Sequence, residues 1–302
     1  MERYQILNGH LQKVEPGDCT DGNLCVFTPE ELQHADRKIL PYTVEECRSG
    51  GPAKLESYDG YDFILLNSAD EKDPYRLHRF GVYLLPGKLY VVVREDDAHI
   101  KKILSLFLEG HVSISSTEKF LYLLLLSLIE GGFEQMEAIS ENVSHLEDQV
   151  LTEADKDCLR KIVFLRKKLM FYKKYYEQLQ DVADRITEND NGLIASKSMR
   201  YFKIFRARTE RLSRYVENLR EAITQVREAY QSQVDIRLNN IMKIFTVVTS
   251  VCLPLTLISG WYGMNFVNMP ELHWRYGYLY VIGLAAVVVT GLIAYCKKKK
   301  IL

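Results

Sequence analysis

Two uncharged stretches near the C-terminus constrain this chain more than any other feature. No charged residue occurs from Ile244 to Pro270, and a second uncharged run extends from Tyr276 to Cys296. Each run is long enough to cross about 30 Å of hydrocarbon as a helix. The segment between them contains Tyr-Gly-Met-Asn-Phe at 262–266 and is too short for a separate domain. The pair therefore predicts a membrane hairpin rather than a buried core hairpin of a soluble protein.

Basic residues predict the orientation of this hairpin. Arg237 and Lys243 precede the first run, and the lysines at 297–300 follow the second. The positive-inside bias then places both termini in the cytoplasm and the connecting loop outside. Residues 1–30 are polar and lack an apolar core, so we expect no secretory signal peptide. The expected location is the cytoplasmic (inner) membrane, in which the chain crosses the bilayer twice.

Composition excludes several other classes. A length of 302 residues is enough for one soluble domain plus the hairpin. The net charge of −1 gives no footprint for binding nucleic acid. The six cysteines show no paired spacing, and we predict no disulfides. No nucleophile–base pair or phosphate-binding loop is recognisable, so an enzyme and a resident cofactor are not expected.

The first 115 residues predict a small α/β domain. Prolines and glycines are dense here, and the segments between them are rich in β-branched and aromatic residues, as in short strands. The predicted strands are Tyr61–Leu66, Phe80–Leu85 and Lys88–Val93, and the predicted short helices are Glu30–Leu40 and Thr43–Cys47. Pro86-Gly87 predicts a hairpin turn between the last two strands.

A polar group follows the last predicted strand and contains Glu95, Asp96, Asp97 and His99. It has the composition of an acid/base site. The interpretation that we favour is a polar strand end, followed by the acidic first turn of a helix that begins near Ala98.

Long helices follow. Apolar residues recur at helical spacing, and we predict two helices at about 117–150 and 155–187, with Thr152 as the N-cap of the second. Between Glu130 and Asp157 there are nine acidic residues and one lysine, which is typical of a solvated face. After Asn191-Gly192, no glycine or proline occurs from Leu193 to Leu253, so we predict one continuous helix into the bilayer. Pro254 should kink it.

One face of this long helix carries residues that a simple membrane anchor does not need. Two lines with sevenfold spacing run side by side, the first through Glu228, Asp235, Met242, Thr249 and Thr256, and the second through Asn239, Thr246, Leu253 and Gly260. Sevenfold spacing keeps one stripe facing a bundle axis. A polar stripe inside a membrane is typical of a helix that lines water, although threonines also bond their own backbone carbonyls. Since one helix cannot enclose a pore, this interpretation requires a cyclic oligomer.

The loop chemistry suits a hydrated cation. Mg²⁺ sheds water reluctantly and is usually held through its waters by oxygen ligands. Gly263 carbonyls and Asn265 side-chain amides, beside Met264, offer such oxygens without a fixed charge at a pore mouth. Leu253 and Met242, with Phe245 near the axis, are predicted to form hydrophobic constrictions that gate by dewetting.

Several of these segments together carry a family resemblance: Asn240–Thr246, Pro254-Leu255-Thr256, 262–266, Met269–Trp274 and the terminal lysines. The chain resembles the CorA family of divalent-cation channels. The resemblance implies a homopentameric funnel that passes Mg²⁺, and in some members Co²⁺ or Ni²⁺. It also implies that the acidic helix lies beside a basic ring of Lys297, Lys298, Lys299 and Lys300. The expected partners are thus other copies of the chain, the lipid bilayer and divalent cations.

Two alternatives stay open within this resemblance. The related ZntB type transports Zn²⁺ with protons, but its members commonly carry another residue at the position of Met264. A helical sensor or scaffold with a hairpin anchor is a second alternative, and the polar stripe opposes it. The family's cytoplasmic Mg²⁺ clamp implies one carboxylate at Glu46 and another at a position that falls on Ile204, which cannot ligate a metal.

The complete expectation is an α+β cytoplasmic domain, a long helical stalk and a two-helix transmembrane hairpin. The expected divisions are an α/β domain at 1–115, a helical hairpin with an acidic first helix at 116–190, a stalk at 191–243, a first membrane helix at 244–262, a loop at 263–275, a second membrane helix at 276–296 and a basic tail at 297–302.

Overall fold

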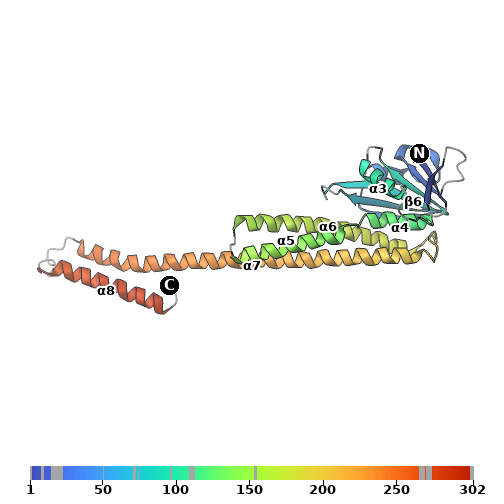
Figure 1. Ribbon diagram of the computed structural model, residues 1–302. Helices are drawn as coiled ribbons and strands as arrows, with labels where there is room; N and C mark the ends of the chain where they lie inside the picture. The colour runs from blue at the N-terminus through green and yellow to red at the C-terminus, as the bar shows by residue number, and fades with distance from the viewer. Residues whose placement is uncertain are drawn as a thin grey trace. The chain divides into compact units, whose positions relative to one another are not determined.

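The computed structural model describes residues 2–7, 10–14, 23–49, 51–70, 73, 75–95, 97–108, 113–152, 155–264, 269 and 274–299 (Figure 1). Contacts divide the chain into two compact units. The first contains Met1–Leu146 and Arg160–Gln225, and the second contains Glu147–Leu159 and Val226–Leu302.

A seven-stranded sheet forms the centre of the first unit. Its strands are β1 (Glu2–Leu7), β2 (His10–Lys13), β3 (Leu24–Phe27), β4 (Lys54–Tyr58), β5 (Tyr61–Ala69), β6 (Leu77–Leu85) and β7 (Lys88–Val93), in the order β2-β1-β3-β7-β6-β5-β4. Among the strands that the structure describes, only β3 and β7 pair in parallel, and all other neighbours are antiparallel. The three predicted strands are confirmed as β5, β6 and β7, and the β6–β7 hairpin turns at Gly87, whose φ is +71°.

Helices cover both faces of this sheet because its central strands are buried throughout. Every residue of β5 from Tyr61 to Ser68 is buried, so neither face can be left in water. On one face α1 (Pro29–Ala35) and α2 (Pro41–Ser49) pack Leu32, Val44 and Cys47 against side chains of the sheet. α1 ends at Ala35, earlier than expected, and begins with a capping box between Thr28 and Glu31.

The predicted helix at 117–150 is wrong as a single element. It is two helices, α4 (Thr117–Ser127) and α5 (Gly132–Thr152), with Gly131 between them at a φ of +69°. Residues other than glycine rarely adopt this conformation, which occurs in the turn that leads into α5. Gly132 matters for packing, because a Cβ there would lie 2.6 Å from Tyr176 Oη. The pair of glycines thus lets α5 begin close to α6 (Lys156–Glu188).

The prediction of Thr152 as an N-cap is also wrong. Thr152 is the last residue of α5, and its hydroxyl donates to the carbonyls of Asp148 and Gln149. Asp155 caps α6 instead, since its Oδ1 accepts from the amide of Cys158 at 2.8 Å. A carboxylate is favourable at a helix N-terminus because it meets the positive end of the helix dipole.

The helical layer is fastened to the sheet by polar contacts. Gln178 on α6 accepts a hydrogen bond from the amide of Ala53 at 3.0 Å. Asn191, just after α6, donates to Asp62 Oδ1 at 2.7 Å and to the carbonyl of Tyr58 at 2.9 Å. Sheet and helices of the first unit therefore form one packed body.

The longest helix, α7 (Met199–Tyr262), confirms the prediction of one continuous element, although it starts six residues after Leu193. Residues between α6 and α7 adopt turns, with Asn189 and Gly192 at φ of 52° and 63°. α7 continues through Pro254 as one helix, and the kink stays a prediction.

The second unit holds the end of α7 and α8 (Gly277–Lys298), which are long and apolar enough to cross a membrane. Their most apolar 18-residue windows have mean hydropathies of 2.0 and 2.3, yet only 0% and 6% of those windows is buried. A core hairpin of a soluble protein would be mostly buried. This exposure fits two helices whose apolar surface faces lipid or other copies of the chain.

Candidate functional site

The predicted stripe of the long helix occupies one side of α7. At about 100° per residue, the ten positions named for it lie within an arc of about 120°. These positions are Glu228, Asp235, Asn239, Met242, Phe245, Thr246, Thr249, Leu253, Thr256 and Gly260, and the structure places all ten on α7. Helical geometry thus places on one side residues that span about nine turns of the helix.

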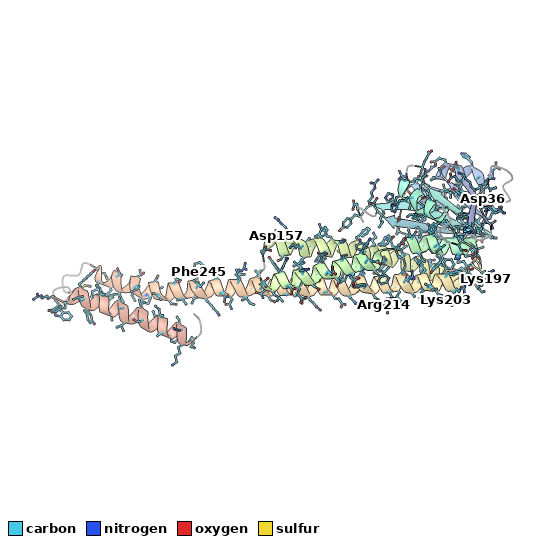
Figure 2. All side chains as sticks on the ribbon, viewed as in Figure 1. Asp36, Asp157, Lys197, Lys203, Arg214 and Phe245 are labelled. Carbon is cyan, nitrogen blue, oxygen red and sulfur yellow. The ribbon has the colours of Figure 1, made fainter. Side chains whose placement is uncertain are left out.

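All ten residues of this stripe are exposed in the single chain. The apolar members are among the most exposed, with Met242 at 62%, Phe245 at 64% and Leu253 at 65%. Figure 2 labels Phe245 on this part of α7. Side chains of this size do not stay in water, so the stripe requires either lipid or neighbouring copies around it.

Two threonines of the stripe bond their own helix, which was the alternative to pore lining. Thr246 Oγ1 donates to the carbonyl of Met242 at 2.8 Å, and Thr256 Oγ1 donates to that of Cys252 at 2.9 Å. A hydroxyl has one donor and two acceptor lone pairs. These bonds use the donor, and the oxygen can still accept from water molecules that hydrate a cation.

An open, mostly apolar groove of about 720 Å³ follows the membrane part of this face. It is lined by Val248, Thr249, Cys252, Leu253, Thr256, Leu257, Gly260, Trp261 and Met264. Four positions of the stripe line it: Thr249, Leu253, Thr256 and Gly260. The groove shows that small and large side chains alternate here, which leaves space along the helix.

The loop motif begins where α7 ends. The amide of Gly263 donates to Ser259 at 2.9 Å and that of Met264 to Trp261 at 3.3 Å, which closes the last helical turn. A Cβ at Gly263 would lie 3.0 Å from the Ser259 carbonyl, so a larger residue would disturb this turn. Asn265 lies outside the described residues.

Aromatic and basic residues mark the ends of the second apolar helix. The ring of Trp274 lies 6.1 Å from that of Tyr276 and 6.2 Å from that of Tyr280, in an amphipathic cluster typical of a membrane interface. At the other end Lys297, Lys298 and Lys299 are exposed. Lys300 lies outside the described residues.

The two positions of the expected cytoplasmic clamp differ in character. Glu46 Oε2 contacts Lys54 Nζ at 2.8 Å, and Lys54 also contacts Glu56 at 2.8 Å. Burial alone lowers the pKa of the Lys54 ammonium, but the bonds to both carboxylates outweigh it and leave that pKa raised. Glu46 therefore already has a positive partner within the chain. Ile204 lies on α7 with 45% of its surface exposed and offers no ligand atom.

Within the polar group at 95–99, Asp97 lies at a helix start, as favoured from the sequence, and Asp96 lies outside the described residues. Asp97 precedes α3 (Ala98–Leu108), and its Oδ1 accepts from the amides of His99 at 3.1 Å and Ile100 at 3.2 Å. The sequence did not indicate that Asp97 Oδ1 also lies 3.0 Å from Nδ1 of His78 in β6. That contact depends on sheet pairing, which local pattern does not show.

Comparisons with known proteins agree over most of the chain. The model of a family described as "CorA-like Mg2+ transporter protein" matches residues 43–298. The chain is 28% identical over 254 residues to the cobalt/magnesium transport protein CorA of Thermotoga maritima, which covers 82% of this chain and 72% of that protein. It is 26% identical over 302 residues to the putative metal ion transporter YfjQ of Bacillus subtilis, covering 97% of this chain and 94% of that one.

The fold has a counterpart among solved structures. The complete structure of the CorA magnesium transporter from Methanocaldococcus jannaschii superposes with a TM-score of 0.80 at 20% identity, over 98% of this chain and 96% of that chain. The likeness shows that this chain has the fold of that structure, with an α/β domain, a long helix and two helices that could cross a membrane.

Proposed function

This chain belongs to the CorA-like Mg²⁺ transporter family, and from that premise we propose that it passes Mg²⁺ through a pore lined by the membrane part of α7. Members of this family are membrane transporters and not enzymes. The finer proposal rests on one observation. A stripe of polar and small residues follows one side of a membrane helix that is otherwise apolar. Its residues are exposed in the single chain, as an oligomer that surrounds an aqueous axis requires.

Each part of the stripe has a chemical role in this proposal. The Asn265 amide and Gly263 carbonyl bind the hydrated ion at the mouth, where neutral oxygens hold a dication weakly enough to release it. Asn239 and the hydroxyls of Thr246, Thr249 and Thr256 accept hydrogen bonds from the ion's water shell further along. Co²⁺ and Ni²⁺ are similar divalent cations that the same ring would admit.

Apolar members of the stripe form the gate. Leu253 and Met242 are single rings of large apolar side chains between polar rings, with Phe245 beside them. When such rings approach the axis, water leaves the constriction and a hydrated ion cannot cross. Small outward movements of α7 readmit water, so the gate needs no charged residue.

The assembly proposed is a homopentamer in the cytoplasmic membrane, with both termini in the cytoplasm. Lysines at the C-terminal end of α8 follow the positive-inside bias, and Lys297–Lys300 of all copies form a basic ring. Exposed acidic side chains line α5, among them Glu137, Glu141 and Glu147. Negative charge of this kind raises the local concentration of cations and partly offsets the lysines.

Flux into liposomes tests this function against the ZntB-like alternative. Purified full-length protein should admit Mg²⁺ into vesicles with an inside-negative potential and no proton gradient, as a passive channel does. Flux of Zn²⁺ that requires a proton gradient, with no Mg²⁺ flux, would instead establish the coupled transporter.

The clamp residues support a further expectation about regulation. Because Ile204 cannot ligate and Glu46 is paired with Lys54, cytoplasmic Mg²⁺ should inhibit this protein less than it inhibits relatives with two facing carboxylates. Glu46→Gln keeps a partner for Lys54 and removes the charge, and we expect it to leave the response to Mg²⁺ unchanged.

Patch recordings with stepped cytoplasmic Mg²⁺ measure this response. Glu56→Gln is the matched control, since Glu56 contacts the same lysine. Complete closure of the wild type by Mg²⁺, lost in Glu46→Gln but kept in Glu56→Gln, would show that Glu46 does hold a regulatory ion.

A further inference from the structure

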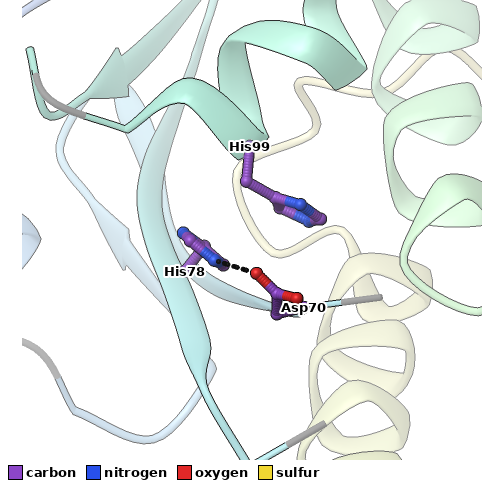
Figure 3. A group of neighbouring side chains, drawn as sticks. All are labelled: Asp70, His78 and His99. Carbon is purple, nitrogen blue, oxygen red and sulfur yellow. Dashed lines mark hydrogen bonds and ion pairs between the residues drawn. The ribbon is translucent and has the colours of Figure 1, made fainter. Parts of the chain in front are cut away.

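Two histidines and a carboxylate meet at one edge of the soluble domain, outside the proposed ion pathway. Asp70 follows β5, His78 lies in β6 and His99 lies in the first turn of α3 (Figure 3). Pairing of Ser68 with His78 in the β5–β6 ladder brings the first two together. One ligand atom from each of the three lies within 4.8 Å of the others.

We propose that Asp70, His78 and His99 bind a late first-row divalent transition metal such as Zn²⁺. The pair His78 and Asp70 already has suitable spacing, with Nε2 and Oδ2 3.1 Å apart. Two ligands at about 2.1 Å from one metal ion stand about 3.0 to 3.4 Å apart at angles between octahedral and tetrahedral. The metal would lie between these two atoms, and His99 offers the third ligand atom within 4.8 Å of both.

Contacts around the ligands fit the outer shell of a metal site. Asp97 Oδ1 lies 3.0 Å from Nδ1 of His78, so this carboxylate orients the ring with Nε2 toward Asp70. Metal-bound histidines are usually held in this way by a carboxylate or carbonyl on the other nitrogen. Ser68 Oγ lies 3.0 Å from Nε2 of His99 and positions that ring. The site is accessible but sheltered, since 13% of the His78 side chain and 22% of the Asp70 side chain are exposed.

The two imidazoles lie face to face. Their rings are stacked, with centroids 4.5 Å apart and planes at 22°. A nitrogen of each ring is therefore close enough to the other and to Asp70 to approach one ion. Metal ions bind imidazole through a neutral ring nitrogen.

The donor set and its surroundings select the kind of metal. Imidazole nitrogens suit Zn²⁺, Co²⁺ and Ni²⁺, whereas Mg²⁺ prefers oxygen ligands and keeps most of its water. Arg76, Arg79 and Arg94 line a recess of about 190 Å³ beside His78 and Asp97. Their positive charge opposes a loosely held hydrated dication. Only an ion that forms strong bonds to nitrogen can offset this electrostatic repulsion.

Calorimetric titration of the metal-stripped full-length protein with ZnCl₂ tests the site. We expect one Zn²⁺ per chain that excess Mg²⁺ does not displace, with a higher midpoint of thermal unfolding on binding. The double variant His78→Gln/His99→Gln should lose this binding, by more than the about 100-fold typical of outer-shell changes. His145→Gln, at an exposed position on α5, and Asn265→Ala in the loop should both bind Zn²⁺ as the wild type does.

A second variant covers the case in which the double variant does not fold. Asp97→Asn keeps an oxygen that can cap α3 but removes the charge beside His78, and should weaken Zn²⁺ binding by about 10- to 100-fold.

Unchanged Zn²⁺ affinity in this variant or in the folded double variant would overturn the proposal, as would displacement by equimolar Mg²⁺ or no binding by the wild type. Loss of binding in Asn265→Ala alone would move the metal to the pore. The test is independent of transport, so failed Mg²⁺ flux leaves its result intact.

Discussion

Replacing Asn265 by alanine is expected to abolish Mg²⁺ uptake while the oligomer still assembles. Asn265 is the one side-chain amide of the Gly-Met-Asn triplet, and its oxygen is proposed to accept from the water shell of the ion. Hydrogen bonds that involve charged groups contribute about 1.5 to 3 kcal/mol each. Loss of only two such bonds from the ring would lower ion occupancy by about 100-fold or more.

Liposome flux and size-exclusion chromatography together measure this result. Asn268→Ala is the matched control, because it removes the same chemical group three positions later in the loop. We expect this control to retain Mg²⁺ uptake. Normal uptake by Asn265→Ala would remove the selectivity role from this residue.

The second large effect is expected at the gate. Replacing Leu253 or Met242 by asparagine should wet the constriction and raise the leak conductance. Since about 1.4 kcal/mol of barrier corresponds to a factor of ten in rate, even a modest gain in hydration should increase conductance about tenfold. Leu253 is 65% exposed in the single chain, so the change creates no cavity within one protomer.

Planar-bilayer recordings of the purified protein measure this leak. Leu255→Asn is the control, because it makes the same substitution about 160° away around α7. The control should assemble without added conductance. Unchanged or lower conductance in both Leu253→Asn and Met242→Asn would place the gate elsewhere, with Phe245 as the next candidate.

The features that the sequence predicted well are those set by local chemistry. Absence of glycine and proline from Leu193 to Leu253 predicts a helix whatever surrounds it, and the uncharged runs predict membrane helices for the same reason. The strands found were the buried apolar ones. β3 is only four residues long, and β4 mixes charged and apolar residues as edge strands do, so neither gave a clear signal.

Features that depend on long-range pairing were missed. The apolar run at 121–126 hid the helix break at Gly131, since the pattern stays helical on both sides. Asp70, His78 and His99 are spread over thirty residues and meet only through strand pairing and the placement of α3. The pore itself belongs to several chains, and a single sequence shows only the stripe that each contributes.

Thiol accessibility tests most directly whether this stripe faces water. In a variant whose membrane cysteines Cys252 and Cys296 are replaced by alanine, cysteine is introduced at Thr256 or, as the control, at Leu255. A charged, water-soluble methanethiosulfonate is applied during Mg²⁺ flux. The proposed pathway predicts that the reagent blocks flux through Thr256→Cys and leaves Leu255→Cys unaffected. Block at Leu255→Cys with no effect at Thr256→Cys would contradict it, because the opposite face of α7 would then line the ion pathway.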